Sequence, residues 1–290
     1  MNRILFFLTG IALALSASAQ QPAAVVEGVQ MPAWLERNEG GTARRSPLAV
    51  GTELRAGDAV KTGEGSRALV KLAEGSAVKV GENATLRITD IEAPREGTFR
   101  AALRVLEGAF RFTTDALAKV RKREVAITVA TVTAGVRGTD LWGKSAGDRQ
   151  TVCLIEGRIE VGAEGEAPVA MDQARQFYRR EKGQTLPLGF VTPEQLGQWA
   201  LETDIAPGTG AARRGGKWRL TLATADTQAA ALAVYDRLRA QGYAAEIRPA
   251  RAGETLVYRV RIGNLPSKDE AEALAARFRG QAGLEPKVSM

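Results

Sequence analysis

The sequence predicts two domains, an all-β N-terminal domain of solenoid- or sandwich-like type and a smaller α+β domain after it. Between Val25 and Arg180, short runs alternate apolar and polar residues, and Gly, Asn and Asp separate them about every eight to twelve residues, as in short strands. After residue 218, two apolar patterns of helical period are interleaved with strand patterns. A length of 290 residues with 44% apolar and 25% charged residues is sufficient for two cores.

The first nineteen residues have the features of a secretory signal peptide. Arg3 gives a positive start, Ile4–Leu15 is apolar except for Thr9 and Gly10, and Ala17-Ser18-Ala19 is a small-residue cleavage site. The apolar run is short for a bilayer span, although an uncleaved anchor is an alternative. No later segment of the sequence is apolar enough to span a membrane. We therefore expect a mature chain in the periplasm, without a transmembrane segment.

The composition excludes several classes of enzyme. The chain has no histidine, which excludes Ser-His-Asp and Cys-His catalysis and most zinc sites. Its one cysteine, Cys153, cannot form an internal disulfide, and it lies in the strand pattern TVCLIEGRIEV, where we expect a buried thiol. Carboxylate chemistry is left open, but no paired-carboxylate motif supports it. We expect no catalytic site, no cofactor and no metal.

The charge balance predicts an acidic partner. The net charge is +7, which often indicates nucleic acid binding. Outside the cytoplasm, however, the acidic partners are lipids and the polymers of the cell wall or capsule. We therefore expect an envelope partner and no nucleic acid.

The β domain is expected to span 25–204 and to end in a helix that closes it. Thr192 can cap a helix over 192–204, Pro193 suits its first turn, and Gln195 can complete a capping box.

The second domain is expected over 218–290, after a linker. The segment 205–217 is rich in Gly, Ala and Arg, and this composition predicts a flexible basic linker. The pattern that follows has the order strand, helix, strand, strand, helix, strand, which is the ferredoxin-like βαββαβ arrangement. The expected strands lie at 218–224, 243–249, 256–263 and 285–289, and the expected helices at 227–241 and 267–280.

One face of this sheet should be covered by the helices and the other left open. Alternate residues of YRVRI and WRLTL are apolar, so each strand has one apolar face. Ser267 and Glu270 form a capping box for the second helix. The helices present apolar residues at i, i+3, i+7 spacing, namely Ala231, Val234, Leu238, Ala271, Leu274 and Phe278. The open face then carries Arg219, Thr221, Arg259 and Arg261, joined from the outer strands by Arg248 and, as a further candidate, Lys287.

Two blocks of the β domain, GTELRAGDAVKTGEGSRALVKLAEGSAVKVGENATLRI and ATVTAGVRGTDLWGKS, and the later CLIEGRIEV resemble the FecR-like periplasmic domain. In iron-responsive members this domain relays a signal from an outer-membrane transporter to a sigma factor. Those members carry a cytoplasmic segment and a spanning helix that this sequence lacks, so the resemblance implies a ligand-binding or scaffold module instead. Arg137 in the second block is a candidate partner contact. Alternatively, Gly138 makes the turn and Arg137 pairs with Asp140 or a carbonyl.

The segment YRVRIGNLPSKDEAEALAARF resembles the second half of SPOR domains, which bind bacterial peptidoglycan. The match is weaker in the first half, where Thr221 and Ala223 stand in place of the family's Gln and Gly. The resemblance implies a preference for glycan strands stripped of their stem peptides, which accumulate at division sites. A stripped strand carries lactyl carboxylates, which guanidinium groups can bind bidentately, and hydroxyl or amide side chains could hydrogen-bond its sugars. The expected glycan-binding residues are Arg219, Thr221, Thr224, Arg248, Arg259, Arg261 and Asn264.

Three functions follow from these patterns. The first is a non-enzymatic periplasmic protein that binds cell-wall glycan through the second domain and uses the first as a scaffold or for an envelope protein. The second is an envelope sensory or signal-relay protein. The third is a wall-modifying enzyme, which the composition disfavours. On a generic sheet the arginines are simply a solvated face, and this interpretation also stays open.

Overall fold

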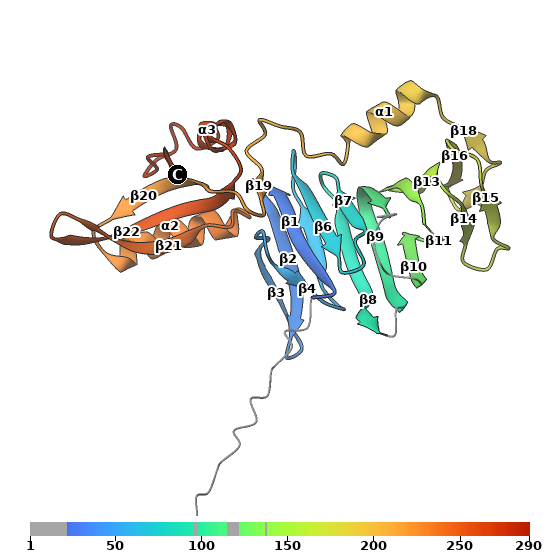
Figure 1. Ribbon diagram of the computed structural model, residues 1–290, viewed down its shortest axis with the longest axis horizontal. Coiled ribbons are helices and arrows are strands. Elements are labelled where there is room, and N and C mark those ends of the chain that lie inside the picture. The colour runs from blue at the N-terminus through green and yellow to red at the C-terminus, as the bar shows by residue number, and fades with distance from the viewer. Residues whose placement is uncertain (1–21, 96–97, 115–121, 137) are drawn as a thin grey trace, which may run out of the picture.

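The computed structural model describes residues 22–95, 98–114, 122–136 and 138–290. The expected signal peptide, 1–19, lies outside the described residues. A long region of strands forms most of the molecule, and a smaller α+β region lies at one end of it (Figure 1).

The long region consists of two sheets that share strand β9 (Thr98–Thr113). In order across the first sheet lie β1 (Ala24–Gln30), β6 (Arg67–Leu72), β7 (Ala77–Val80), the end of β9, β12 (Asp140–Ala146), β13 (Arg149–Glu156) and β16 (Gln176–Glu181). Short strands flank its two sides: β4 (Glu53–Leu54) and β19 (Ala212–Arg213) beside β1, and β17 (Gln184–Thr185) and β18 (Gly189–Phe190) beside β16.

The second sheet contains the start of β9. In order across it lie β3 (Thr42–Pro47), β2 (Ala33–Glu39), β5 (Ala59–Thr62), β8 (Thr85–Arg95), β9, β10 (Lys122–Val129), β11 (Val132–Val136), β14 (Ile159–Ala163) and β15 (Val169–Met171). The pairing of β9 with β10 is parallel, whereas the other pairings of this sheet are antiparallel.

Strand β9 serves both sheets because the backbone changes direction at Gly108. Residues up to 107 pair with β8, and residues from 108 onward pair with β12. Gly108 has φ +84°, and a Cβ at this position would collide with Ala84. Only glycine satisfies both conditions, so this residue fixes where the chain passes from one sheet to the other.

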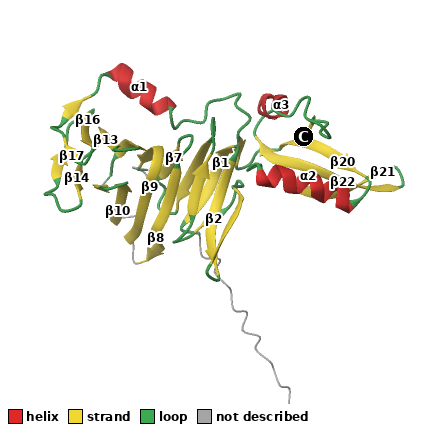
Figure 2. Ribbon diagram, turned by 180° about the vertical axis from the view of Figure 1, so that it is seen from behind, coloured by secondary structure: helices red, strands yellow, loops and turns green. Residues whose placement is uncertain are grey.

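Alternate side chains from the two sheets enclose a common core. Phe99, Phe110 and Phe112 of β9 are almost fully buried, and they belong to one cluster with residues of both sheets. Each such side chain contributes roughly 1.5–3 kcal/mol of transfer free energy. Across the described residues, the sheets remain open and do not close into a barrel. The predicted all-β character of this region is confirmed, since strands and loops make up nearly all of it (Figure 2).

The helix predicted after the sheets is α1 (Pro193–Leu201). Its N-cap is Thr192, whose hydroxyl accepts a hydrogen bond from the N–H of Gln195 at 3.2 Å. Trp199 stacks on Trp142 of β12, with ring centroids 4.4 Å apart. A second, smaller core therefore forms under α1, separate from the core between the sheets.

Cys153 of β13 lies in this smaller core and is fully buried. Burial raises the pKa of its thiol to about 12. The thiol is therefore protonated at neutral pH, and its surroundings are those of a packing residue rather than of a nucleophile.

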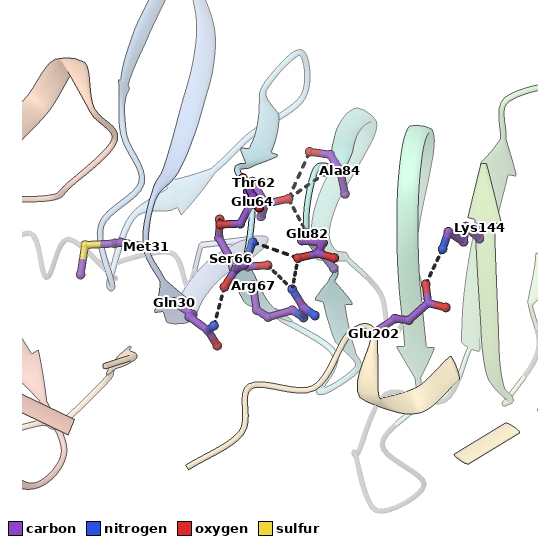
Figure 3. Close-up of polar contacts among 12 residues, drawn as sticks. Gln30, Met31, Thr62, Glu64, Ser66, Arg67, Glu82, Ala84, Lys144 and Glu202 are labelled. Carbon is purple, nitrogen blue, oxygen red and sulfur yellow. Dashed lines mark hydrogen bonds and ion pairs between the residues drawn. The ribbon is translucent and has the colours of Figure 1, made fainter. Parts of the chain in front are cut away.

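Beyond α1, ion pairs hold the chain along the first sheet. Lys144 of β12 binds Glu202 at 2.7 Å (Figure 3), and Lys79 of β7 binds Asp204 at 2.5 Å. These partly exposed pairs each contribute up to about 1 kcal/mol. The segment 205–217, for which the composition predicts a flexible linker, then follows, and its strand β19 pairs with β1. Backbone hydrogen bonds thus tie this segment to the first sheet.

The C-terminal region is a four-stranded antiparallel sheet with two helices. Across the sheet lie β21 (Glu246–Ala252), β22 (Thr255–Leu265), β20 (Trp218–Ala225) and β23 (Lys287–Ser289), and the helices are α2 (Gln228–Ala240) and α3 (Lys268–Ala276). The chain order is therefore strand, helix, strand, strand, helix, strand. The helices bury their predicted apolar residues against Leu220 and Leu222 of β20 and Val260 and Ile262 of β22.

Glu270 of α3 joins the C-terminal region to the segment before it. The predicted capping box forms only in part, because Ser267 accepts from the N–H of Glu270 while the carboxylate of Glu270 points elsewhere. This carboxylate accepts hydrogen bonds from the backbone N–H groups of Gly208, Gly210 and Ala211 at 2.7, 2.6 and 3.0 Å. With only 8% of its surface exposed, Glu270 satisfies three backbone donors, and those of Gly210 and Ala211 would otherwise be buried without partners.

Further contacts fix the C-terminal region against the β sheets and the segment between them. Arg277, just after α3, donates to the carbonyl of Met31 at 2.7 Å and to that of Thr209 at 2.8 Å. Gly242, with φ +84°, lies so close to the Trp34 ring that a Cβ would be 2.6 Å from it. The N–H of Ala33 also donates to the carbonyl of Gly242. The two regions are therefore in direct contact.

We expect Glu270→Ala to lower the free energy of unfolding by about 3 kcal/mol, because it leaves buried N–H groups without an acceptor. Urea denaturation of the mature chain measures this change. Hydrogen exchange at residues 208–211 should also become faster in this variant. Glu272→Ala is the matched control on the same helix, because its carboxylate makes only an exposed ion pair with Arg279. Equal stability of the two variants would contradict this role of Glu270.

Candidate functional site

The side of the C-terminal sheet opposite α2 and α3 carries a group of arginines. Side chains alternate between the two faces of a strand, and the apolar residues of β20 and β22 are covered by the helices. The other face is therefore open. We call it the arginine face, and it consists of Arg219, Thr221, Thr224, Arg248, Arg259 and Arg261.

The strand register arranges these residues in two rows. Arg261 lies opposite Thr221 on one side and opposite Glu246 on the other. Arg259 lies opposite Thr224 and Arg248 in the same way. Residues directly opposite one another share a face, so the rows place side chains from three strands on one surface.

A β-bulge brings Thr224 to this face. Strict alternation from Thr221 would place Thr224 on the covered side, together with Leu222. The register shifts between Thr221 and Ala223, so that Thr224 lies opposite Arg259. The extra residue reverses the alternation from that point onward. The sequence alone gives no sign of this bulge.

Glu246 also lies on this side of the sheet, opposite Arg261, although it is not among the residues predicted from the sequence. Its carboxylate binds Arg261 at 2.8 Å and Arg248 at 2.7 Å. Burial by itself would raise the pKa of Glu246, but the hydrogen bonds and charges of the two arginines outweigh burial and lower this pKa. Glu246 thus partly neutralises two of the predicted arginines. The i, i+2 spacing of Glu246 and Arg248 on one strand was the available signal.

Arg219 and Arg259 have no ion-pair partner in the part of the chain that the structure describes. Arg259 is exposed and Arg219 is half-buried. Their guanidinium groups are therefore the ones available to an external anion. Lys287 of β23, which lies opposite Thr221, contacts Glu285 at 3.4 Å.

Asn264 lies near the end of β22 and has φ +61°. It does not belong to the two rows but lines a groove of about 500 Å³ together with Arg219 and Arg248. The opposite wall of this groove comes from the end of β3 and the loop after it, at residues 46–50. The structure thus places Asn264 beside the arginine face, at the junction with the β sheets.

Arg137 lies outside the described residues, so its role as a partner contact stays a prediction. The residues around it are described. Gly138 has φ +68°, as the predicted turn requires. Asp140, the alternative partner for Arg137, is bound by Arg111 through two hydrogen bonds of 2.9 and 2.6 Å.

Metal-binding clusters and membrane-spanning helices are both absent from the described residues. These residues contain no group of three or more acidic or cysteine side chains placed to hold a metal ion. No helix in that part of the chain has the length and apolar character needed to cross a membrane.

Comparison with known families agrees with these two regions. A model described as "FecR protein" matches residues 58–160, and a model described as "SPOR domain" matches residues 215–289. The chain carries a FecR domain followed by a SPOR domain. The SPOR match contains the whole arginine face, and the FecR match contains β9 and most of the core residues between the two sheets. The domain order predicted from the sequence is therefore confirmed.

The chain is also similar in structure to a candidate anti-sigma factor from Parabacteroides distasonis ATCC 8503. One crystal structure, at 1.65 Å resolution, has 12% identity and a TM-score of 0.40, with coverage of 69% of this chain and 97% of that chain. Another, at 2.50 Å, has 14% identity and a TM-score of 0.41, with coverage of 77% and 91%. Among curated proteins, none matches this chain.

The lowered pKa of Glu246 predicts a pH-dependent contribution to stability. A carboxylate that is more acidic when folded stabilises the fold above its ordinary pKa and loses this effect as the pH falls through the lowered value. We expect the difference in unfolding free energy between the wild type and Glu246→Gln to be present at pH 7 and to decrease below pH 4.5, the ordinary value. Urea denaturation over this pH range measures it. The exposed Glu254→Gln serves as the control, and a difference for Glu246→Gln that is constant with pH would contradict the prediction.

Proposed function

We propose that the chain is a periplasmic, non-enzymatic cell-wall-binding protein, exported by a cleaved signal peptide. Its SPOR domain, taken as a ferredoxin-like βαββαβ sheet, binds denuded peptidoglycan glycan strands on the arginine face. The observation that carries this proposal is the pair Arg219 and Arg259, which share the open face and have no ion-pair partner among the described residues. The match to SPOR domains supports peptidoglycan as the polymer.

The chemistry of the face suits a stripped glycan. Removal of the stem peptide leaves a free carboxylate on each lactyl group, and guanidinium binds carboxylate through two parallel hydrogen bonds. Thr221 and Thr224 lie directly opposite Arg261 and Arg259 and can hydrogen-bond sugar hydroxyl groups. Asn264 can do the same for an acetamido group.

The ion pairs of Glu246 make some arginines of the face more available to an incoming carboxylate than others. Arg248 and Arg261 already share one carboxylate, so an incoming carboxylate must compete with Glu246 for them. Arg219 and Arg259 meet no such competition. We therefore expect one arginine from each of the two central strands to dominate binding, with Arg248 and Arg261 in a secondary role.

The FecR domain is proposed to bind an envelope protein or to act as a scaffold for the SPOR domain. Its match and its contacts with the SPOR domain support this role. The buried thiol of Cys153, with its raised pKa, offers no nucleophile for wall chemistry.

The test is binding of the mature chain to sacculi treated with amidase, compared with untreated sacculi. We expect tighter binding to treated sacculi, and a loss of at least about tenfold in affinity for Arg259→Ala, because a hydrogen bond to a charged group contributes about 1.5–3 kcal/mol. Arg251→Ala is the matched control, since Arg251 lies on the same hairpin with its side chain on the opposite face. Equal binding to both kinds of sacculi, or equal binding by both variants, would count against the proposal.

The alternative is an envelope sensory or signal-relay protein, which the FecR match favours. In this case transcription of envelope genes changes when the chain is deleted, and Arg259→Ala restores it fully, because the relay does not need glycan. If glycan binding is the function, Arg259→Ala fails to restore the deletion phenotype. Transcript profiles of the deletion strain complemented with the wild type, Arg259→Ala or Arg251→Ala distinguish the two.

A further inference from the structure

The groove beside Asn264 is built by both domains. Its volume of about 500 Å³ lies within the range of small-molecule sites. The SPOR side contributes Arg219, Arg239 and Arg248. The other side, which we call the FecR side, contributes Leu48, Ala49 and Val50, which lie in the β-sheet region just before the FecR match at 58–160. Arg219 therefore belongs both to the arginine face and to this groove, so the two are continuous.

The charge of the groove favours an anion. Three arginines line it, and the one carboxylate in its lining, Glu246, is shared between Arg248 and Arg261. Arg239 donates to the neutral hydroxyl of Tyr235 at 3.1 Å and has no ion-pair partner among the described residues. The positive charge in the groove thus exceeds the negative charge, which favours an anionic ligand.

The wall from the FecR domain is apolar and held in place by its backbone. The N–H of Leu48 donates to the carbonyl of Ala33 at 2.8 Å, and the N–H of Thr52 donates to the carbonyl of Ala49 at 3.2 Å. A sugar ring has apolar C–H faces as well as polar groups. This wall can pack against such a face while the opposite wall supplies guanidinium, hydroxyl and amide groups.

The groove is formed before any ligand binds. The contacts of Glu270 with residues 208–211 and of Arg277 with Met31 hold the SPOR wall against the FecR wall. Gly242 packs on Trp34 at the same junction. A ligand therefore does not have to bring the two domains together, which lowers the entropic cost of binding.

We propose that this groove is a further saccharide subsite, in which the FecR domain contacts a carboxylate-bearing amino sugar of the glycan strand that lies on the arginine face. This inference rests on the proposed function, because the strand must already occupy the face. It assigns to the β-sheet region that contains the FecR match a direct part in glycan recognition, through Ala49 and Val50, with Arg219 and Arg239 binding the carboxylate.

The experiment uses the mature full-length chain and amidase-stripped glycan strands fractionated by length. Ala49→Trp fills the groove from the FecR side, and Ala43→Trp is the matched control on β3, outside the groove. We expect Ala49→Trp to weaken binding of long strands by about tenfold, the loss of one good contact, and to abolish the gain in affinity between short and long strands. Ala43→Trp should bind as the wild type does.

A second variant tests the groove independently, in case Ala49→Trp does not fold. Arg239→Ala removes a groove charge whose side chain bonds only to Tyr235, and we expect a loss of several-fold for strands with free carboxylates and none for strands whose carboxylates are amidated. If both groove variants bind like Ala43→Trp while Arg259→Ala loses binding, the subsite is disproved and the proposed function stands. If Arg259→Ala also binds normally, the proposed function itself fails.

Discussion

The carboxylate of Glu270 determines how the SPOR domain is positioned relative to the β sheets. A buried carboxylate is stable only when its oxygens are hydrogen-bonded, and here the donors are three backbone N–H groups of the segment between the domains. A glycine-rich segment can present several N–H groups to one acceptor because its backbone is unrestricted. The segment thereby becomes part of the C-terminal fold at one end, while β19 makes it part of the first sheet at the other. The domain arrangement follows from this double attachment.

The domain arrangement in turn gives the arginine face an asymmetric environment. Its outer end, at the β21–β22 hairpin, is open to solvent, and its inner end meets the loop after β3. Arg259 is accordingly exposed, whereas Arg219 is half-buried in the groove between the domains. The two arginines without an ion-pair partner among the described residues therefore differ in their surroundings.

Glu246 determines which arginines of the face keep their full positive charge. Glu246 holds Arg248 and Arg261 in fixed positions and neutralises part of their charge, as its lowered pKa reflects. A surface of four arginines without a carboxylate would be strongly self-repelling. Arg219 and Arg259 keep their full charge. Arg248 and Arg261, which are bound to Glu246, contribute hydrogen-bond donors in fixed positions. The difference between these two kinds of arginine is visible only in the folded sheet.

The sequence by itself determined the identity of the elements, and the tertiary structure decided how they are joined. Period-two and helical patterns, cap residues such as Thr192 and the apolar sides of β20 and β22 depend on local chemistry, so they could be predicted. The bulge that turns Thr224, the partners of Glu246 and the three donors of Glu270 depend on register and on contacts between segments distant along the chain. Composition indicated flexibility over 205–217, because a glycine-rich composition shows only which backbone conformations a segment can adopt. It cannot report the acceptors that the folded chain brings to that backbone.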